Sequence, residues 1–173
     1  IPSGVIKIGG SAFKGCSGMT SAVILSGVTE IGDDIFHSCV SLKNVKIGKI
    51  SEIGSYMFYD CSSLTSIVIP EGVESISMSA FEGCTSLAEL DVSGWDTSSV
   101  TDMREMFYGC SKLATVTCLA TSGINQDYSI SYWLNVAGSQ AEGTKTVNTV
   151  SSANWPSGDN GIPTGWTRVN IEN

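Results

Sequence analysis

The chain has 173 residues, of which 42% are hydrophobic, and it carries a formal net charge of -8 at pH 7. This length and composition suit one domain or one repeat array with a buried core. The nine Lys and Arg residues are scattered along an acidic chain, which argues against nucleic acid as a partner. No apolar run approaches the roughly 20 residues of a membrane-spanning helix, so we expect no transmembrane segment.

The sequence begins inside a repeat. Residues 1–5 align without a gap with residues 69–73, and the match continues to Phe13 and Phe81. The strand that should precede Ile1 is missing, and no signal peptide pattern is present. We therefore expect a mature or truncated part of a longer chain, whose first turn leaves core surface open.

One spacing, Phe-x-x-Cys-x-x-Leu-x-x-Ile-x-Ile, recurs along two thirds of the chain. All five phenylalanines occupy the same place in it, at steps of 23, 22, 23 and 26 residues: Phe13, Phe36, Phe58, Phe81 and Phe107. These steps lie in the range of leucine-rich repeats, about 20 to 29 residues. One unit cannot bury its apolar residues alone, whereas stacked units share a continuous core. The sequence therefore predicts a solenoid.

Each unit combines a short strand with a return limb. Val45 and Ile47 alternate with polar residues, which predicts a strand with one buried face. Val28 and Ile31 belong to a return limb that closes the core from the other side. Residues 103–107 have a higher helix propensity than the Gly-rich return limbs before them. The expected fold is an α/β-type solenoid, with a parallel sheet on one face and irregular or short helical return limbs.

Five of the six cysteines stand three residues after a phenylalanine, and the sixth takes a core strand position: Cys16, Cys39, Cys61, Cys84, Cys110 and Cys118. We interpret them as small buried thiols that face the core. A disulfide framework of an exported chain is the alternative, because equivalent Cα atoms about 5 Å apart overlap the disulfide range.

The regular spacing ends at Cys118. We assign residues 1–118 to the repeats and residues 119–173 to an irregular C-terminal cap continuous with the solenoid. Within the cap, residues 143–148 and 165–170 each follow the pattern of a strand that starts at a glycine, and residues 128–136 that of a short helix. We expect Trp95, in the lengthened fifth unit, to cover a turn rather than to stack on a ligand.

These motifs resemble a known family. Phe-x-x-Cys-x-x-Leu-x-x-Val-x-Ile-Pro, with the pattern of residues 28–36, resembles the BspA-like leucine-rich repeats of bacterial surface proteins. Residues 95–110 are similar to a related repeat of about 26 residues in bacterial surface lipoproteins. Residues 161–167 resemble the end segment of such proteins in gut Bacteroidetes-type bacteria.

The resemblance implies an extracellular or cell-surface location, with a signal or lipid anchor upstream of this chain. It also implies that the protein is not an enzyme, because the family offers no catalytic motif to match. Some family members are adhesins for host matrix proteins.

Chemistry-bearing residues are few. His37 is the single histidine, so any catalytic triad or multi-histidine zinc site would depend on it. Asp33 and Asp34 are adjacent carboxylates that we interpret as solvated turn residues. A calcium site near Asp91, Asp96 and Asp102, or at residues 159–161, is the alternative, although neither spacing matches a calcium loop. We expect no cofactor and no structural metal.

A binding surface is the favoured site. Outward strand residues alternate with the core positions and form two files along the expected sheet. The candidate binding residues are Asn44, Lys46, Ser66, Val68, Glu89, Asp91, Thr115 and Thr117. We expect a monomeric, non-enzymatic module that binds a host or neighbouring-cell protein or glycan through this face. A structural spacer that projects another domain and has no ligand of its own is the alternative.

Overall fold

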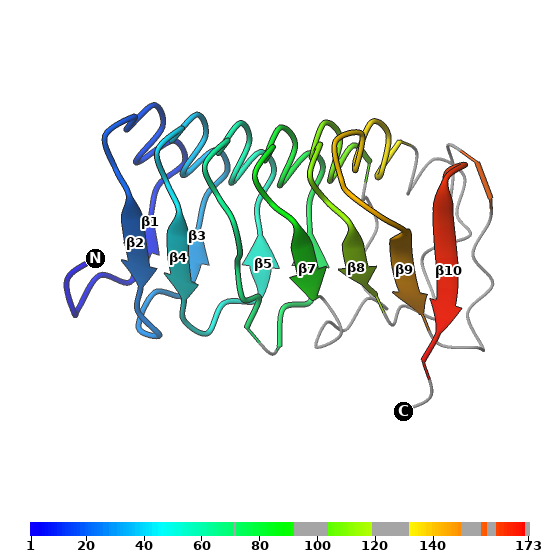
Figure 1. The fold of residues 1–173 in the computed structure, drawn as a ribbon. Helices are drawn as coiled ribbons and strands as arrows, with labels where there is room; N and C mark the ends of the chain where they lie inside the picture. Colours follow the sequence, from blue (N-terminus) through cyan, green and yellow to red (C-terminus); the bar gives the residue numbers. More distant parts are fainter. Residues whose placement is uncertain (71, 92–103, 119–131, 150–156, 159–161, 172–173) are drawn as a thin grey trace.

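The computed structural model describes residues 1–70, 72–91, 104–118, 132–149, 157–158 and 162–171. It is a solenoid of parallel strands, in which each turn of the chain stacks on the turn before it (Figure 1). The predicted solenoid is therefore confirmed. In chain order, the strands are β1 (Lys7–Ile8), β2 (Ser21–Ile24), β3 (Glu30–Ile31), β4 (Asn44–Ile47), β5 (Glu52–Ile53), β6 (Ser75–Ile76), β7 (Glu89–Asp91), β8 (Thr115–Thr117), β9 (Lys145–Thr149) and β10 (Trp166–Asn170).

The strands lie on two opposite faces of the solenoid. The front face carries β2, β4 and β7 to β10, and the back face carries β1, β3, β5 and β6 (Figure 1). On the front, β2 pairs with β4, and β7, β8, β9 and β10 pair in that order. On the back, β1 pairs with β3 and β5 with β6. The prediction of a parallel sheet on one face is therefore incomplete. Short paired strands also form in the return limbs, on the opposite face.

The remaining part of each return limb forms a ridge of tight turns. We call it the turn ridge; it comprises residues 11–15, 34–38, 56–60, 79–83, 105–109 and 132–136. Two residues in each turn have left-handed backbone conformations, as at Tyr56 (φ 56°) and Asp60 (φ 55°). Amide groups of the ridge donate to carbonyls of the following turn, as from Phe58 N to Ala80 O at 2.8 Å. Left-handed residues and inter-turn hydrogen bonds are incompatible with an α-helix.

The helical return limbs predicted from the sequence are therefore wrong. The part of the chain that the structure describes contains no helix, and so none that could cross a membrane. At residues 104–107, Glu105 has a φ of 54°, and Phe107 N donates to Trp133 O of the next turn at 2.8 Å. Neighbouring turns thus override local helix propensity. The short helix expected at residues 128–136 is replaced by turns over 132–136, and its first part lies outside the described residues.

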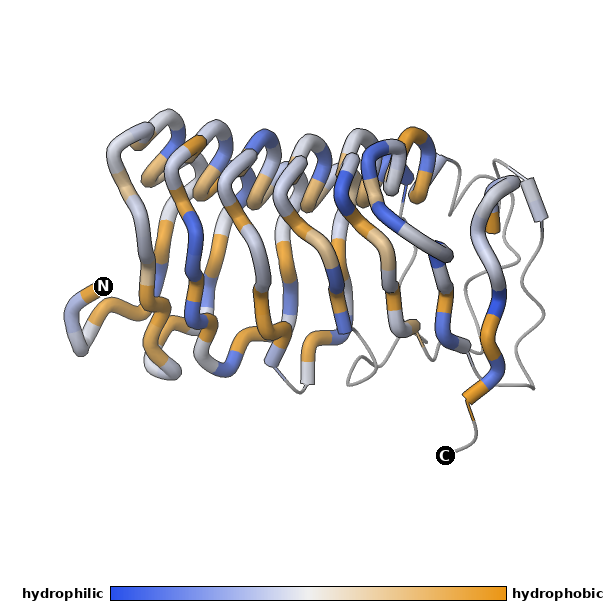
Figure 2. The backbone as a smooth tube through the Cα atoms, in the orientation of Figure 1, coloured by the Kyte–Doolittle hydropathy of each residue, from blue (hydrophilic) through white to orange (hydrophobic). Residues whose placement is uncertain are grey.

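The core is a column of stacked rings. Successive phenylalanine rings lie 5.3 to 5.8 Å apart and are nearly parallel, from Phe13 through Phe36, Phe58 and Phe81 to Phe107. Figure 2 shows apolar segments at matching places in successive turns. The strand residues predicted to face inward, such as Val45 and Ile47, are buried. This register explains why all the phenylalanines share one repeat position.

The unit between Phe36 and Phe58 is one residue shorter than its neighbours. Residues 47–50 connect front and back with one residue fewer than residues 24–28 or 69–73. Gly48 allows this short path, since its N donates to Ile24 O at 2.8 Å and a Cβ there would lie 2.6 Å from Ser26 N. No pairing joins β3 to β5 among the described strands. Ser55 N instead donates to the Asp33 carboxylate at 2.8 Å.

A further turn follows Cys118, where the regular spacing ends. Phe107 N donates to Trp133 O, and Tyr132 and Val136 have the same left-handed conformations as earlier ridge residues. Trp133 is buried, with its ring 6.0 Å from that of Phe107. The strands predicted at residues 143–148 and 165–170 are confirmed as β9 and β10, which extend the front sheet. Trp95 and Trp155 lie outside the described residues.

Candidate binding surface

The first half of the candidate surface lies on β2, β4 and the segment after them. Asn44 and Lys46 point outward from β4, opposite Ser21 and Val23 of β2. On its other side Lys46 forms a parallel bridge with Val68. Val68 is 79% exposed and Val23 43% exposed. The structure therefore brings a lysine between two exposed valines on adjacent turns, and Ser66 is exposed nearby in sequence.

The second half lies on β7 and β8. Glu89 pairs in register with Thr115, and Asp91 with Thr117. Both acidic residues are exposed, whereas both threonines are half-buried. No strand pairing is described between Val68 and β7, so the predicted residues form two separate groups. The two groups also differ in charge. The surface is basic and apolar on its first half and acidic on its second.

The surface continues onto β9, and this continuation was not predicted from the sequence. Thr146 Oγ1 lies 3.4 Å from Thr115 Oγ1, and Asn148 Nδ2 donates to Thr117 Oγ1 at 3.0 Å. These side chains occupy some of the hydrogen-bonding capacity of the two threonines. A glycine followed by Lys145-Thr146-Val147-Asn148 did predict a strand, but not its register beside β8.

The single histidine lies on the turn ridge and not on the sheet. His37 Nδ1 is 2.6 Å from Asp34 Oδ1, and Lys14 Nζ is 2.9 Å from the same oxygen. Lys14 and His37 together hold the pKa of the Asp34 carboxyl below its usual value. The adjacent Asp33 bonds instead to the backbone of Ser55. The two carboxylates thus have separate structural partners and do not form an acid and base pair.

No metal site is evident among the residues that the structure describes, where no three His, Cys, Asp or Glu side chains gather around a common point. Of the calcium ligands considered from the sequence, Asp91 is exposed on β7. Asp96, Asp102 and residues 159–161 lie outside the described residues. No disulfide joins any of the six cysteines, of which five are buried and Cys16 is half-buried.

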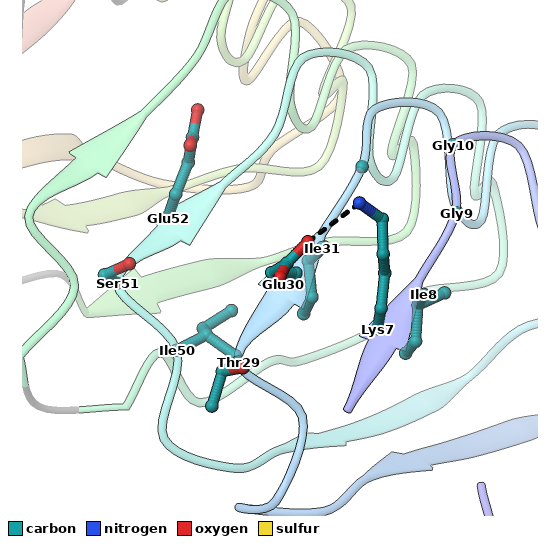
Figure 3. Close-up of a pocket in the computed structure, with 11 residues that line it drawn as sticks. Lys7, Ile8, Gly9, Gly10, Thr29, Glu30, Ile31, Ile50, Ser51 and Glu52 are labelled. Carbon is teal, nitrogen blue, oxygen red and sulfur yellow. Dashed lines mark ion pairs between the residues drawn. The ribbon is translucent and has the colours of Figure 1, made fainter. Parts of the chain in front are cut away.

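Two hollows lie at the N-terminal end of the solenoid. One, of about 550 Å³, is lined mainly by apolar residues of the first turn, including Phe13 and Met19. The other, of about 340 Å³, lies on the back face where β3 and β5 are unpaired (Figure 3). An exposed ion pair between Lys7 and Glu30, 2.8 Å long, lies at the second hollow.

Comparison with known protein families agrees with this architecture. The model of the BspA type leucine-rich repeat region matches residues 1–114 and 49–132, in six copies. The chain belongs to the BspA-type leucine-rich-repeat family. The strands from β1 to β8 and the ring column from Phe13 to Phe107 thus belong to the BspA-type repeats, and the match ends at residue 132, before β9 and β10. No curated protein matches the chain significantly.

Solved structures of bacterial leucine-rich-repeat proteins share this fold. A T. pallidum leucine-rich-repeat protein is 28% identical with a TM-score of 0.60, over 68% of this chain and 55% of that one. A leucine-rich cell surface protein from Faecalibacterium prausnitzii is 33% identical with a TM-score of 0.58, over 67% and 30%. A leucine-rich-repeat protein from Bacteroides ovatus is 26% identical with a TM-score of 0.55, over 86% and 38%. This chain therefore covers about half or less of the length of these solved relatives.

Proposed function

We propose that this chain is a non-enzymatic binding module at a bacterial cell surface, which recognises a protein or glycan of a host or a neighbouring cell. The relationship to a leucine-rich cell surface protein supports the location. The BspA-type repeat family supports an interaction role over catalysis. A solenoid also offers what such a role needs, an extended outward strand surface on a rigid core.

The observation that carries the proposal is the Val23, Lys46 and Val68 row on the front face. Isolated exposed apolar residues are common, but two valines on either side of one lysine form a contiguous mixed patch. A partner that covers these valines would gain apolar burial at about 25 cal/mol per Å². Lys46 would contribute charge complementarity and so favour an acidic group on the partner.

The test is a binding screen of the chain against host matrix proteins and glycans. A double variant, Lys46→Glu with Val68→Ser, reverses the charge and removes one apolar contact. A control, Lys49→Glu, makes the same charge change on an exposed turn outside the row. We expect saturable binding that the double variant weakens at least about tenfold, or about 1.4 kcal/mol, and that the control retains.

A structural spacer is the second candidate, favoured by the continuous ring column from Phe13 to Trp133. A spacer needs stiffness but no ligand. If no partner binds at concentrations that would detect micromolar affinity, the front-face proposal fails and the spacer is the better description. Equal weakening by both variants would show that net charge, and not the row, determines binding.

A further inference from the structure

The turn ridge carries a second surface, which lies outside the strands of the front sheet. Tyrosines and carboxylates alternate there on three consecutive turns. We call this set the acidic tyrosine cluster; it consists of Tyr56, Tyr59, Asp60, Glu82, Glu105 and Tyr108. None of these residues was assigned a role from the sequence.

Inter-turn hydrogen bonds fix the order of these residues. Asp60 N donates to Glu82 O at 2.7 Å, and Gly83 N donates to Tyr108 O at 2.8 Å. Equivalent positions on neighbouring turns therefore lie about 4.8 Å apart, as in paired strands. Since Tyr59, Glu82 and Tyr108 occupy equivalent positions, the Glu82 carboxylate emerges between two phenol side chains.

Two of the three tyrosine rings are held by ring contacts, and all three remain at least partly accessible. The Tyr59 ring packs against His37, with centroids 4.7 Å apart, and against the edge of Tyr56 at 5.8 Å. Tyr56 and Tyr59 are half-buried, and Tyr108 is exposed. Preformed aromatic faces of this kind bind cations at little cost in side-chain entropy.

The carboxylates of the cluster form no ion pair with any described residue, and Glu82 and Glu105 lie close enough to repel each other. The ion pairs within the described part of the chain join Lys7 to Glu30, and Lys14 and His37 to Asp34. None includes Asp60, Glu82 or Glu105. Burial raises the pKa of Glu82, and the nearby Glu105 carboxylate raises it further. The same carboxylates, Glu82 foremost, raise the pKa of the Tyr59 hydroxyl.

A buried hydroxyl at the centre of the cluster is also unsatisfied. Ser79 lies on the ridge between the turns of Tyr56 and Glu105, and it is fully buried. Its hydroxyl is near enough to Glu82 to hold down the pKa of that carboxyl, but it falls short of hydrogen-bond geometry. A buried polar atom without a partner costs about 1 to 3 kcal/mol. A ligand that fixes the Glu82 carboxylate within hydrogen-bond reach of the Ser79 hydroxyl would remove this cost, which would favour binding.

We propose that the acidic tyrosine cluster binds arginine or lysine side chains of a basic protein segment. A guanidinium or ammonium group would lie over Glu82, between Tyr59 and Tyr108, and would be neutralised by Glu82 and Glu105. Carboxylates provide charge-assisted hydrogen bonds, and the two ring faces add cation–π attraction. An acidic peptide or a neutral sugar lacks the cation that these carboxylates and ring faces attract, so neither fits the cluster as well.

The experiment measures binding of a peptide of alternating arginine and glycine, at low ionic strength, by isothermal titration calorimetry. A peptide with citrulline in place of arginine keeps the shape and removes the charge. We expect saturable binding of the arginine peptide and none of the citrulline peptide. The double variant Glu82→Gln with Glu105→Gln should weaken binding about tenfold, since two partly buried charge pairs are lost. Tyr108→Ser, at an exposed position, should weaken it severalfold.

Two controls make the result decisive. Glu74→Gln with Glu142→Gln removes the same charge at exposed positions away from the ridge, and it should change affinity less than about twofold. The front-face variant Lys46→Glu with Val68→Ser should leave peptide binding intact, which separates this proposal from the proposed function. The proposal would be overturned if the citrulline peptide bound equally well, or if binding did not saturate up to millimolar peptide. It would also be overturned if the Glu82 and Glu105 double variant and its charge-matched control lost the same affinity. Urea unfolding of each variant confirms that the fold is retained.

Discussion

At the scale of single residues, the repeated cysteine is a hydrogen-bonding member of the core. From the second repeat to the fifth, the thiol donates to the carbonyl of the phenylalanine one turn earlier, as from Cys61 Sγ to Phe36 O at 3.1 Å and from Cys84 Sγ to Phe58 O at 3.2 Å. The same contact joins Cys110 to Phe81 at 3.1 Å. Cysteine thus fills a small apolar space and also adds a second hydrogen bond to a carbonyl that already accepts from a backbone amide, as Phe36 O does from Cys39 N at 3.0 Å.

We expect the thiols to differ sharply in reactivity. Burial raises the pKa of Cys61 and of Cys110 to about 12, and it also raises the pKa of Cys84. At neutral pH these groups stay protonated, and only the thiolate is nucleophilic. Timed alkylation of the native protein with iodoacetamide, followed by peptide mass spectrometry, should label the half-buried Cys16 first. Labelling of Cys61 as fast as Cys16 would contradict the buried ladder, and unfolding in urea should expose all six thiols.

A second prediction concerns the stability that one ladder thiol contributes. Cys84→Ala removes both a buried sulfur atom and the donor to Phe58 O, so we expect it to lower the free energy of unfolding by about 2 kcal/mol. Cys16→Ala is the matched control, because Cys16 is half-buried, and it should cost less than about 1 kcal/mol. Urea denaturation measures both values. Equal costs at the two sites would show that the hydrogen bond and burial contribute little.

At the scale of an element, the short connection at residues 47–50 decides where the back sheet is interrupted. A path one residue shorter cannot place β5 in register beside β3, and Ile31 stays half-buried where Ile8, Ile53 and Ile76 are buried. The strand edges on either side of the interruption border the 340 Å³ hollow. One residue fewer in this connection thus interrupts the back-face pairing between β3 and β5.

We predict that Gly48→Ala is destabilising by about 1 to 3 kcal/mol, because a Cβ there would overlap the backbone of Leu25 and Ser26 at 2.6 to 2.8 Å. Gly27→Ala, in the longer equivalent turn, is the control. A Cβ at Gly27 has its nearest neighbour, Val5 O, at 4.0 Å, so the change should stay within about 0.5 kcal/mol. Chemical denaturation compares the two, and equal midpoints would mean that the short turn relaxes without cost.

At the scale of the whole molecule, stability comes from contacts between neighbouring turns. Such one-dimensional stacking predicts that damage stays local and that the ends open first. Trp133 closes the ring column at its far end, against Phe107. Among the described residues, Trp133 is therefore the last ring of the column.

Trp133→Ala should cost about 3 to 5 kcal/mol, as for other buried aromatic residues. We expect faster hydrogen exchange in residues 104–118 and 132–149 and unchanged exchange in residues 34–64, measured by mass spectrometry. Tyr132→Ala, at an exposed neighbour, should leave exchange unaltered. Uniformly faster exchange along the chain would indicate a single cooperative unit instead of nearest-neighbour stacking.

The fold was largely predictable because Phe and Cys mark every turn up to Cys110. The turn at residues 132–136 was not predicted, because Leu134 stands in place of the phenylalanine and Ala137 in place of the cysteine. The turn ridge was not predictable, because left-handed conformations occur at Tyr56 and Glu105, where no glycine signals them. The outward positions of the candidate surface followed from strand alternation, but the separation of Val68 from β7 depends on pairing that periodicity does not encode.

The missing pairing between β3 and β5 makes one junction mechanically weak. There the back face contributes no ladder, and the front face joins the two turns by the bridge from Lys46 to Val68. The turn ridge still connects them, with Phe36 N bonded to Met57 O at 2.9 Å. Under tension along the solenoid axis, rupture would begin on the back face and open the molecule about the ridge, leaving the first two turns to separate together as one block.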